Sequence, residues 1–360
     1  MKEEKPNINL EKIKKIALVI LGLVLIINII LLTSITQEFN KRIKEAKESA
    51  RPADISLTII NADCKDCHDI NELVDMIKKA NVNIKEENIL VKEKASDLIT
   101  KYGIQKLPSV IITGEIDKVK ITGFEQKDDA LIFNEQLPPY FDLKTNNIVG
   151  LVELTLITDP SCTECTDLTQ TIPSLKQVLI ITKETTLTKT QASSLITKYK
   201  IEKLPSLILS KDASLYTEIA SSWNAYGTIE EDGSLIFRNV LPPYKDLETN
   251  KVRGVVKLTS ITDNTCAECY NVSTHELILD RYGVYIKNKE TIDITQAKSL
   301  IDKYKIEKVP TIILTGDIEI YTSLTQVWQQ VGTIETDGAY VFRSVEQMGK
   351  YRDLKTGKVA

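Results

Sequence analysis

The six cysteines of the chain are the residues whose type and spacing could carry chemistry. They stand in three Cys-x-x-Cys pairs, "NADCKDCHDI" at 61–70, "DPSCTECTDL" at 159–168 and "DNTCAECYNV" at 263–272. Such a pair could be a redox dithiol, half of a zinc site, a haem-attachment point or a structural disulfide. All six cysteines lie in these pairs, so the chain has three copies of the same kind of site.

The pairs belong to a longer repeated pattern. Their first cysteines are Cys64, Cys162 and Cys266, so the intervals are 98 and 104 residues. A second mark recurs in phase as "KYGIQKLPS" (101–109), "KYKIEKLPS" (198–206) and "KYKIEKVPT" (303–311). A third follows as "LPPYFDLKTN" (137–146), "LPPYKDLETN" (241–250) and the weaker "MGKYRDLKTG" (348–357). Three marks in one order predict three homologous domains, because solenoid repeats have periods of only about 20–50 residues.

Each unit has the same expected elements. An alternating apolar strand, 55–60 in the first unit, comes before the cysteine pair, which we place at a strand-to-helix turn. A helix is expected at 68–80 and a second strand at 82–91. An Asp-Gly hairpin is expected late in the second and third units. The first unit has no Asp-Gly at that point, so its sequence does not predict the hairpin.

This order of elements resembles the thioredoxin superfamily. The second cysteine of each pair precedes a proline by 41, 40 and 41 residues, counted from 67 to 108, 165 to 205 and 269 to 310, which is typical of that family. The resemblance implies an α/β fold with three tandem thioredoxin-like domains, each a central mixed sheet flanked by helices. We expect these domains at 54–150, 151–253 and 254–360.

The resemblance also implies where a substrate would bind. In the family the proline is cis and faces the dithiol, and the backbone just before it pairs with an extended substrate peptide, a form of strand addition. The substrate-binding residues implied here are Leu107, Pro108, Leu204, Pro205, Val309 and Pro310.

The catalytic residues implied are the six cysteines. A cysteine at a helix N-terminus faces unpaired amides and the positive end of the helix dipole, which favour the thiolate. Cys64, Cys162 and Cys266 are therefore expected to be nucleophiles. Cys67, Cys165 and Cys269 are expected to resolve the mixed disulfide. A carboxylate precedes each second cysteine (Asp66, Glu164 and Glu268) and opposes thiolate formation.

Other interpretations of the pairs remain open. Structural disulfides fit an exported protein, although a loop this short stabilises the fold little. Zinc needs four ligands, which two pairs could supply only if their sites faced each other. "CKDCH" at 64–68 matches a haem c attachment pattern, but Thr166 and Tyr270 stand where the first unit has His68, so we expect no cofactor. His275 is expected on the exposed side of a helix.

The N-terminal region predicts a membrane anchor. Residues 16–35 carry no charge over 20 positions, enough for a transmembrane helix after a tail at 1–15 and before a charged spacer helix at 36–53. Lys12, Lys14 and Lys15 precede this segment and place the N-terminus in the cytosol and the bulk outside. A cleaved signal peptide is the alternative. The net charge of -4 gives no reason to expect nucleic acid as a partner.

Together these features predict a single-pass membrane protein that acts as a thiol-disulfide oxidoreductase or isomerase on exported protein thiols. Its expected partners are the lipid bilayer at 16–35, client proteins with thiols or disulfides, and a redox partner that recycles it. The alternative is a binding or scaffold protein that keeps the fold and holds the cysteine pairs as structural disulfides.

Overall fold

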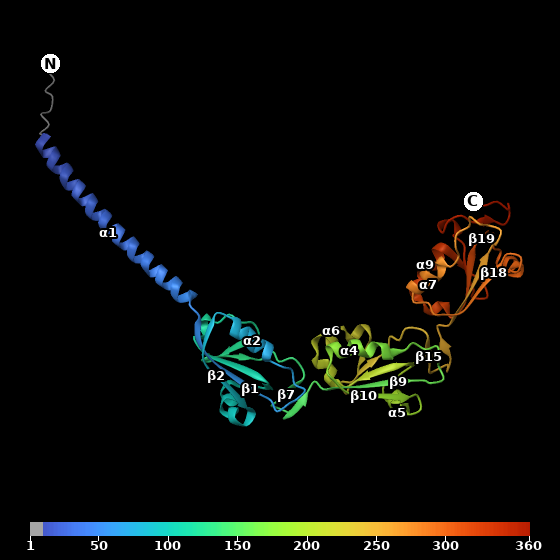
Figure 1. Cartoon of the computed structure of the whole chain (residues 1–360), viewed down its shortest axis with the longest axis horizontal. Coiled ribbons are helices and arrows are strands. Elements are labelled where there is room, and N and C mark those ends of the chain that lie inside the picture. Colours follow the sequence, from blue (N-terminus) through green and yellow to red (C-terminus); the bar gives the residue numbers. More distant parts are fainter. Residues whose placement is uncertain (1–9) are drawn as a thin grey trace, which may run out of the picture. The chain divides into compact units, whose positions relative to one another are not determined.

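The computed structural model describes residues 10–360 and begins with one long helix. This helix, α1, runs from Leu10 to Ala50 without a break (Figure 1). Positions 1–9 of the expected tail lie outside the described residues, and residues 10–15 belong to α1; the expected boundary between tail and membrane span at 15 stays a prediction. The expected spacer helix is the second half of α1. Its 41 residues rise about 60 Å, roughly twice the hydrocarbon core of a bilayer.

Among the described residues, none buries the apolar half of α1. Its large apolar side chains between Ile16 and Ile35 are about half exposed or more. Within 10–360, Lys14–Ala50 is the one helix long and apolar enough to cross a membrane. A signal sequence near the N-terminus can meet the same criteria of length and hydropathy, so the helix by itself supports either form of membrane targeting.

Three five-stranded sheets follow, all with the same strand order. We use the expected bounds as names, repeat 1 (54–150), repeat 2 (151–253) and repeat 3 (254–360); only β1 extends beyond them, by one residue at its start. The sheet of repeat 1 has the order β2 (Val82–Val91), β1 (Ala53–Asn61), β4 (Ser109–Gly114), β6 (Ala130–Phe133) and β5 (Phe124–Lys127). That of repeat 2 is β10 (Ile181–Thr188), β9 (Val152–Thr158), β12 (Ser206–Leu209), β14 (Leu235–Phe237) and β13 (Gly227–Ile229). That of repeat 3 is β18 (Ile286–Asp293), β17 (Val256–Thr262), β20 (Thr311–Gly316), β22 (Tyr340–Phe342) and β21 (Gly332–Ile334).

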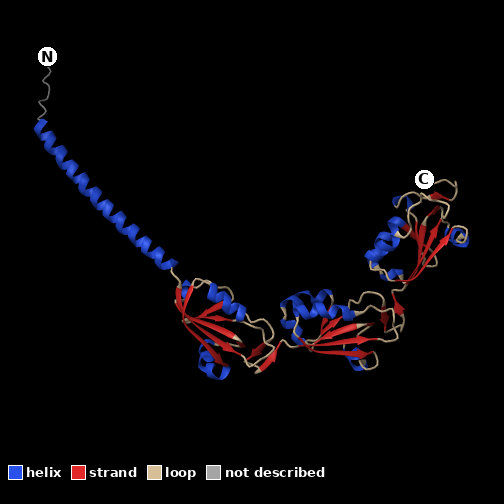
Figure 2. Ribbon diagram, in the orientation of Figure 1, coloured by secondary structure: helices blue, strands red, loops and turns tan. Residues whose placement is uncertain are grey.

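Each sheet is mixed (Figure 2). Its first strand in sequence pairs parallel with the second and antiparallel with the strand that follows the proline. The last two strands form an antiparallel hairpin in all three repeats. Repeat 1 therefore has the hairpin that its sequence did not predict, and its turn is made by Asp128 at φ 50° and Asp129 in place of Asp-Gly.

Helices cover both faces of each sheet; in repeat 2, Figure 1 shows α4 and α6 on one side and α5 on the other. Repeat 1 has α2 (Asn71–Lys79), η1 (Lys92–Ala95), α3 (Ser96–Tyr102) and η2 (Ile116–Lys118). Repeat 2 has η3 (Leu168–Thr171), α4 (Ile172–Val178), α5 (Ser193–Lys198), η4 (Lys211–Leu215), α6 (Thr217–Ser222) and η5 (Trp223–Ala225). Repeat 3 has α7 (Thr274–Arg281), α8 (Lys298–Tyr304), η6 (Ile318–Ile320), α9 (Thr322–Val331) and η7 (Val345–Gln347). Each sheet has two apolar core clusters.

The repeated Lys-Tyr mark joins a helix to the hairpin turn. Tyr199 is buried at the end of α5, and its hydroxyl donates to the carboxylate of Asp232 at 2.9 Å. Lys198 pairs with the same carboxylate at 2.6 Å. The same tyrosine–aspartate contact recurs in the other two repeats. The mark is therefore explained by packing, because a buried phenol needs a hydrogen-bond partner.

By its internal contacts the described chain separates into two compact units. One unit consists of the described residues up to Gln136 together with Tyr140–Asn147. The other consists of Leu137–Pro139 and Ile148–Ala360 and holds two of the three sheets. The division into three domains at 54–150, 151–253 and 254–360 therefore stays a prediction.

Short strands complete each repeat outside its main sheet. They are β3 (Lys106–Leu107), β7 (Tyr140–Asp142) and β8 (Asn147–Val149), then β11 (Lys203–Leu204), β15 (Tyr244–Asp246) and β16 (Val252–Arg253), then β19 (Lys308–Val309) and β23 (Arg352–Asp353).

Candidate redox site

All six cysteines form disulfides within their own pairs. The bonds are Cys64–Cys67, Cys162–Cys165 and Cys266–Cys269, each with 5.4 Å between the Cα atoms. Cys162 is the least exposed of those that begin a pair, at 9%. The other five cysteines are partly exposed. The sulfurs of each pair are thus within bonding reach, as a dithiol site requires.

The cysteines lie in turns and not at helix N-termini, which corrects a sequence-based expectation. In repeat 1 the pair ends at Cys67 and α2 begins only at Asn71, so the predicted helix at 68–80 is shorter by three residues at its start. In repeat 3, α7 begins at Thr274, five residues after Cys269. Because the helix dipole acts within the first turn, it does not reach the leading cysteine of either pair.

The register of the sheet brings the disulfide and the proline to one edge. Ile60, near the end of β1, pairs antiparallel with Ser109, the residue after Pro108. The corresponding pairs are Ile157 with Ser206 and Ile261 with Thr311. Because antiparallel neighbours end and begin at the same edge, the turn with the cysteines and the proline loop meet there in all three repeats.

The three prolines of this edge are buried and follow cis bonds. The bonds are Leu107–Pro108, Leu204–Pro205 and Val309–Pro310. The hydroxyl group of the next residue is also buried and donates to a hairpin carbonyl, from Ser109 to Phe133 at 3.0 Å in repeat 1. Two further cis bonds, Pro138–Pro139 and Pro242–Pro243, lie in the third repeated mark.

The chain itself pairs with the backbone just before each cis proline. Leu107 of β3 pairs antiparallel with Phe141 of β7. Leu204 of β11 pairs with Lys245 of β15, and Val309 of β19 pairs with Arg352 of β23. We call β7, β15 and β23 the tail strands. They occupy the place in which the resemblance implies a substrate peptide.

The hydrogen-bond pattern of each ladder shows that the N–H and the C=O of Leu107, Leu204 and Val309 are both bonded to a tail strand. In repeat 1 the amide of Leu143 donates to the carbonyl of Gln105 at 2.9 Å. Hydrogen-bonded pairs of an antiparallel ladder recur every second residue, so Leu107 and Phe141 form the next such pair. The equivalent bonds run from Leu247 to Glu202 and from Leu354 to Glu307. A peptide could therefore add beside Leu107, Leu204 or Val309 only by displacing a tail strand.

In repeat 3 a polar contact joins the turn that holds the cysteines to Pro310, and nothing in the sequence indicated it. Tyr270 follows Cys269, and its hydroxyl donates to the carbonyl of Pro310 at 2.8 Å. The same oxygen lies 3.0 Å from Nε2 of His275. Since the only phenol proton goes to Pro310, Nε2 must carry the proton that His275 donates.

His275 is buried, which corrects its expected place on the exposed side of a helix. Only 3% of the residue is exposed. Its ring lies edge-on against Phe342, with 4.6 Å between the ring centroids. Burial lowers the pKa of His275 to about 4, and burial also raises the pKa of Tyr270. Both groups are therefore neutral at physiological pH.

Haem and metal find little support in the arrangement of side chains. His68 is exposed in a turn, and its cysteines are bonded to each other. Within residues 10–360 there is no group of three or more His, Cys, Asp or Glu side chains placed to hold a metal ion.

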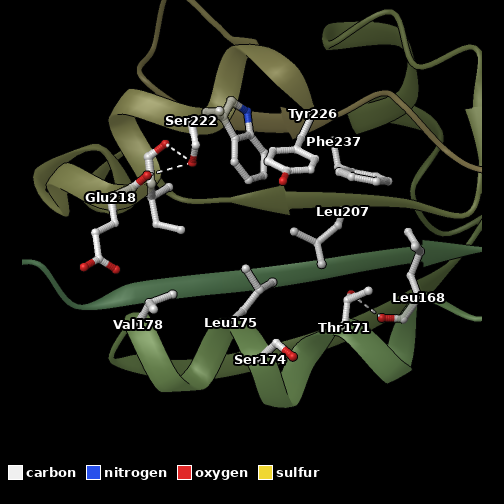
Figure 3. Close-up of a pocket in the computed structure, with 12 residues that line it drawn as sticks. Leu168, Thr171, Ser174, Leu175, Val178, Leu207, Glu218, Ser222, Tyr226 and Phe237 are labelled. Atoms are coloured by element: carbon white, nitrogen blue, oxygen red, sulfur yellow. Dashed lines mark hydrogen bonds between the residues drawn. The ribbon is translucent and has the colours of Figure 1, made fainter.

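Repeat 2 contains an apolar cavity of about 490 Å³ between α4 and the α6–η5 segment. Leu168 and Leu175 line one side, and Trp223 and Phe237 belong to the other; Figure 3 shows Leu175 and Val178 pointing from the helix toward the gap, with Tyr226 and Phe237 opposite. In repeat 3, His275 stands where repeat 2 has Thr171, both six residues after the second cysteine, and its ring packs where repeat 2 is hollow. The volume of the repeat 2 cavity lies within the usual range for small-molecule pockets, about 300–1,000 Å³.

Comparisons with known proteins give little beyond redox proteins at low similarity. No family model matches the sequence, and no curated protein matches it. Among solved structures, a mutant of the alkylhydroperoxide reductase AhpF from Enterococcus faecalis is 16% identical over 49% of this chain and 90% of its own, with a TM-score of 0.16. A protein disulfide oxidoreductase from Aeropyrum pernix is 14% identical over 48% and 82%, with a TM-score of 0.15. The zinc-bound form of human ERp44 is 10% identical over 84% and 86%, with a TM-score of 0.16. Likeness of this size carries no argument, so the proposals below rest on the geometry of the chain.

Proposed function

We propose that the chain is a thiol-disulfide oxidoreductase with three thioredoxin-like domains, at 54–150, 151–253 and 254–360. One observation carries the proposal. In every repeat the sheet register places a Cys-x-x-Cys disulfide and a buried cis proline at the same edge. The short loop between the cysteines argues against a stabilising role for the disulfides, because such a bond constrains the unfolded chain little.

The reaction follows from the bonds present. A thiolate of a client attacks one sulfur of the pair, the Cys64–Cys67 bond breaks, and a mixed disulfide and one cysteine thiolate form. A second client thiolate then attacks the client sulfur of that mixed disulfide, so the client gains a disulfide and the pair is left as two thiols. The two electrons reside on the pair until an external disulfide oxidant removes them. In the reverse direction Cys64 attacks a client disulfide and Cys67 resolves it.

The carboxylates beside the second cysteines modulate this chemistry. Glu268 pairs with Lys350, and that hydrogen bond holds the pKa of Glu268 below its usual value. The lysine also offsets the negative charge that Glu268 would otherwise present to Cys269. In repeat 1, Asp66 is exposed and has no ion pair in the described part of the chain, so its charge acts on Cys67 screened only by solvent.

The proposed location is a membrane surface. Residues 16–35 would span the bilayer, with Lys12, Lys14 and Lys15 on the cytosolic side and the three repeats outside. An oxidising compartment would keep the disulfides formed. Clients would be exported proteins, and a redox partner would recycle the pairs. A protease added to intact cells would digest the repeats only if this orientation holds.

A redox titration tests the function. The full chain in detergent would be equilibrated across glutathione buffers, alkylated and counted by intact mass, with peptide mapping for each pair. Potentials between about −120 and −270 mV would support catalysis, since known thiol-disulfide catalysts fall there. Pairs that stay oxidised below about −300 mV would be structural disulfides and would overturn it.

A binding role is the second candidate, and the cavity of repeat 2 favours it. Its lining is mostly apolar, and the carboxylate of Glu218 at its rim has no hydrogen bond or ion pair within residues 10–360. Trp223 reports on the cavity in a Trp328→Phe protein. A saturable change of its fluorescence with decylammonium, weaker with decanoate and altered by Glu218→Gln, would support this role. A flat response to both probes would count against it.

A further inference from the structure

The three tail strands pair alike with the backbone before the cis proline, but they are held differently to the cysteine turn. We use "cysteine turn" for residues 61–68, 159–166 and 263–270. The residues that decide the difference occupy two equivalent positions. One lies three residues before the first cysteine. The other is the tail residue paired with Leu107, Leu204 or Val309.

In repeat 3 these positions form an ion pair. Asp263 accepts from the Arg352 guanidinium, and the Asp263 side chain is 0% exposed. Asp263 also accepts from the amide and hydroxyl of Thr265 at 2.8 and 2.6 Å. Burial pushes the pKa of Asp263 upward, but Thr265 and Arg352 together hold it below its usual value. Tail strand β23 cannot leave without separating Arg352 from a buried carboxylate, which is costly.

Two further contacts hold the same tail. Lys350 forms an ion pair with Glu268, inside the Cys266–Cys269 pair. The amide of Tyr270 donates to the carbonyl of Lys350 at 2.8 Å. The cysteine turn and the tail of repeat 3 are thus tied by two ion pairs and by backbone.

In repeat 2 the ties are weaker. Asp159 and Lys245 stand at the two positions, yet the structure, which describes both, has no ion pair between them. Asp159 accepts from the amide and hydroxyl of Ser161, as Asp263 does from Thr265, but it lacks the ion pair. The tail is held by Thr166, whose amide and hydroxyl donate to the carbonyls of Pro243 and Leu241, each at 2.8 Å.

In repeat 1 neither position is charged. Asn61 and Phe141 stand there, and within the described residues no hydrogen bond or ion pair joins 61–68 to 140–147. Phe141 is held by packing and by Lys92, whose Nζ lies 4.4 Å from the ring centroid. Before the tail, Gln136 is buried; its Nε2 donates to the carbonyls of Phe133 and Lys106, while its Oε1 has no hydrogen-bond partner among residues 10–360. A buried acceptor without a partner favours opening, because water would satisfy it.

We infer that tail strand β7 is the one that opens to admit an extended polypeptide beside Leu107, so that Cys64–Cys67 is the client-facing pair. The Asp263–Arg352 ion pair keeps repeat 3 closed, and the hydrogen bonds of Thr166 hold repeat 2 more weakly. The inference rests on the proposed function in one respect: a client is a protein that exchanges thiols or disulfides with a cysteine pair. The opening of the tails does not depend on redox activity and is measured separately.

The first experiment is hydrogen exchange on the full chain in detergent, with all disulfides intact. The amides at positions 141, 245 and 352 each belong to a hydrogen-bonded pair beside the cis proline, so their exchange reports tail opening. We expect position 141 to exchange at least about tenfold faster than position 352, a ratio that corresponds to about 1.4 kcal/mol. Equal rates at positions 141 and 352 would overturn the inference.

Exchanging the residues tests the cause. The Asp263→Asn, Arg352→Phe protein carries the pair of repeat 1 in repeat 3, and its amide at 352 is expected to exchange at least about tenfold faster. Glu290→Gln is the matched control, since it breaks the exposed Lys257–Glu290 pair of the same repeat and leaves the tail intact.

If the double variant fails to fold, the reciprocal change in repeat 1 tests the inference. Asn61→Asp, Lys92→Ile, Phe141→Arg places the ion pair in repeat 1 and removes the lysine that would repel it. Exchange at 141 should then slow, and an unchanged rate would refute the inference.

Reaction with glutathione separates this inference from the proposed function. Short exposures followed by alkylation and peptide mapping give the reduction rate of each pair in one sample. We expect the order Cys64–Cys67, then Cys162–Cys165, then Cys266–Cys269, with the third pair accelerated in the double variant. Equal rates that the variant does not change would overturn the inference and leave the oxidoreductase function standing. If all three pairs resist reduction while hydrogen exchange shows the tails opening in the expected order, the oxidoreductase function is overturned and the inference about tail opening stands.

Discussion

Replacing His275 by phenylalanine should remove an acid sensitivity of repeat 3. His275 is buried against Phe342, and burial lowers its pKa to about 4 from the usual value of 6.5. Below pH 6.5 the unfolded chain binds a proton at this residue and the native chain does not, so native stability falls with pH until it levels off below the folded pKa.

The size of the effect follows from the two pKa values. With 6.5 unfolded and about 4 folded, the linkage relation gives a loss of about 2 kcal/mol between pH 7 and pH 5. The full difference is about 3.4 kcal/mol and is reached below pH 4. At a urea m-value of about 2 kcal/mol/M, the loss between pH 7 and pH 5 lowers the unfolding midpoint by about 1 M.

The assay uses the fluorescence of Trp328, which is buried in the same core cluster as Phe342. A Trp223→Phe background leaves Trp328 as the single tryptophan. Urea unfolding at both pH values is compared with and without His275→Phe, because the carboxylates of the chain titrate in both proteins and cancel in the difference. His68→Gln is the control, since His68 is exposed in repeat 1. The reasoning is refuted if His275→Phe has the same pH dependence as its parent, or if NMR titration places the pKa of His275 near 6.5.

Three further outcomes are expected. Leu107→Ala should destabilise repeat 1 by about 2–5 kcal/mol, because Leu107 is 0% exposed; hydrogen exchange in β1 and β4 measures it, and a loss below 1 kcal/mol would contradict the burial. Tyr199→Phe should destabilise repeat 2 by about 1 kcal/mol through its lost bond to Asp232, as Trp223 fluorescence in urea will report, and an unchanged midpoint would refute the role given to the Lys-Tyr mark. Deleting residues 1–35 should move the protein from the membrane fraction to the soluble fraction, and a truncated protein that stays in the membrane fraction would point to a second membrane contact.

Local signals in the sequence predicted the regular elements well. The strand expected at 82–91 has those bounds as β2. The helix expected at 68–80 is α2 at Asn71–Lys79. The hairpin of repeat 1 escaped prediction because its turn lacks Asp-Gly and instead uses Asp128 in the left-handed conformation.

Contacts between distant segments were harder to predict. The expectation placed His275 on the exposed side of a helix, yet its ring lies against Phe342 and its Nε2 against the hydroxyl of Tyr270. Asp263 and Arg352 are 89 residues apart, and nothing local marks them as partners. Aligning the three repeats could have pointed to them, because the first and third differ in charge at both positions, Asn61 and Phe141 against Asp263 and Arg352.

By itself, the sequence determined that three units share one order of strand, cysteine pair, Lys-Tyr mark and proline, and that an apolar helix precedes them. These are properties of neighbouring residues, and their periodicity and spacing record them directly. Only the tertiary structure decided that the cysteine turns lie outside the helices, and that a tail strand already pairs with the backbone beside each cis proline. Both depend on the pairing of segments far apart in the chain, which the register of the sheet sets and no single stretch of residues encodes.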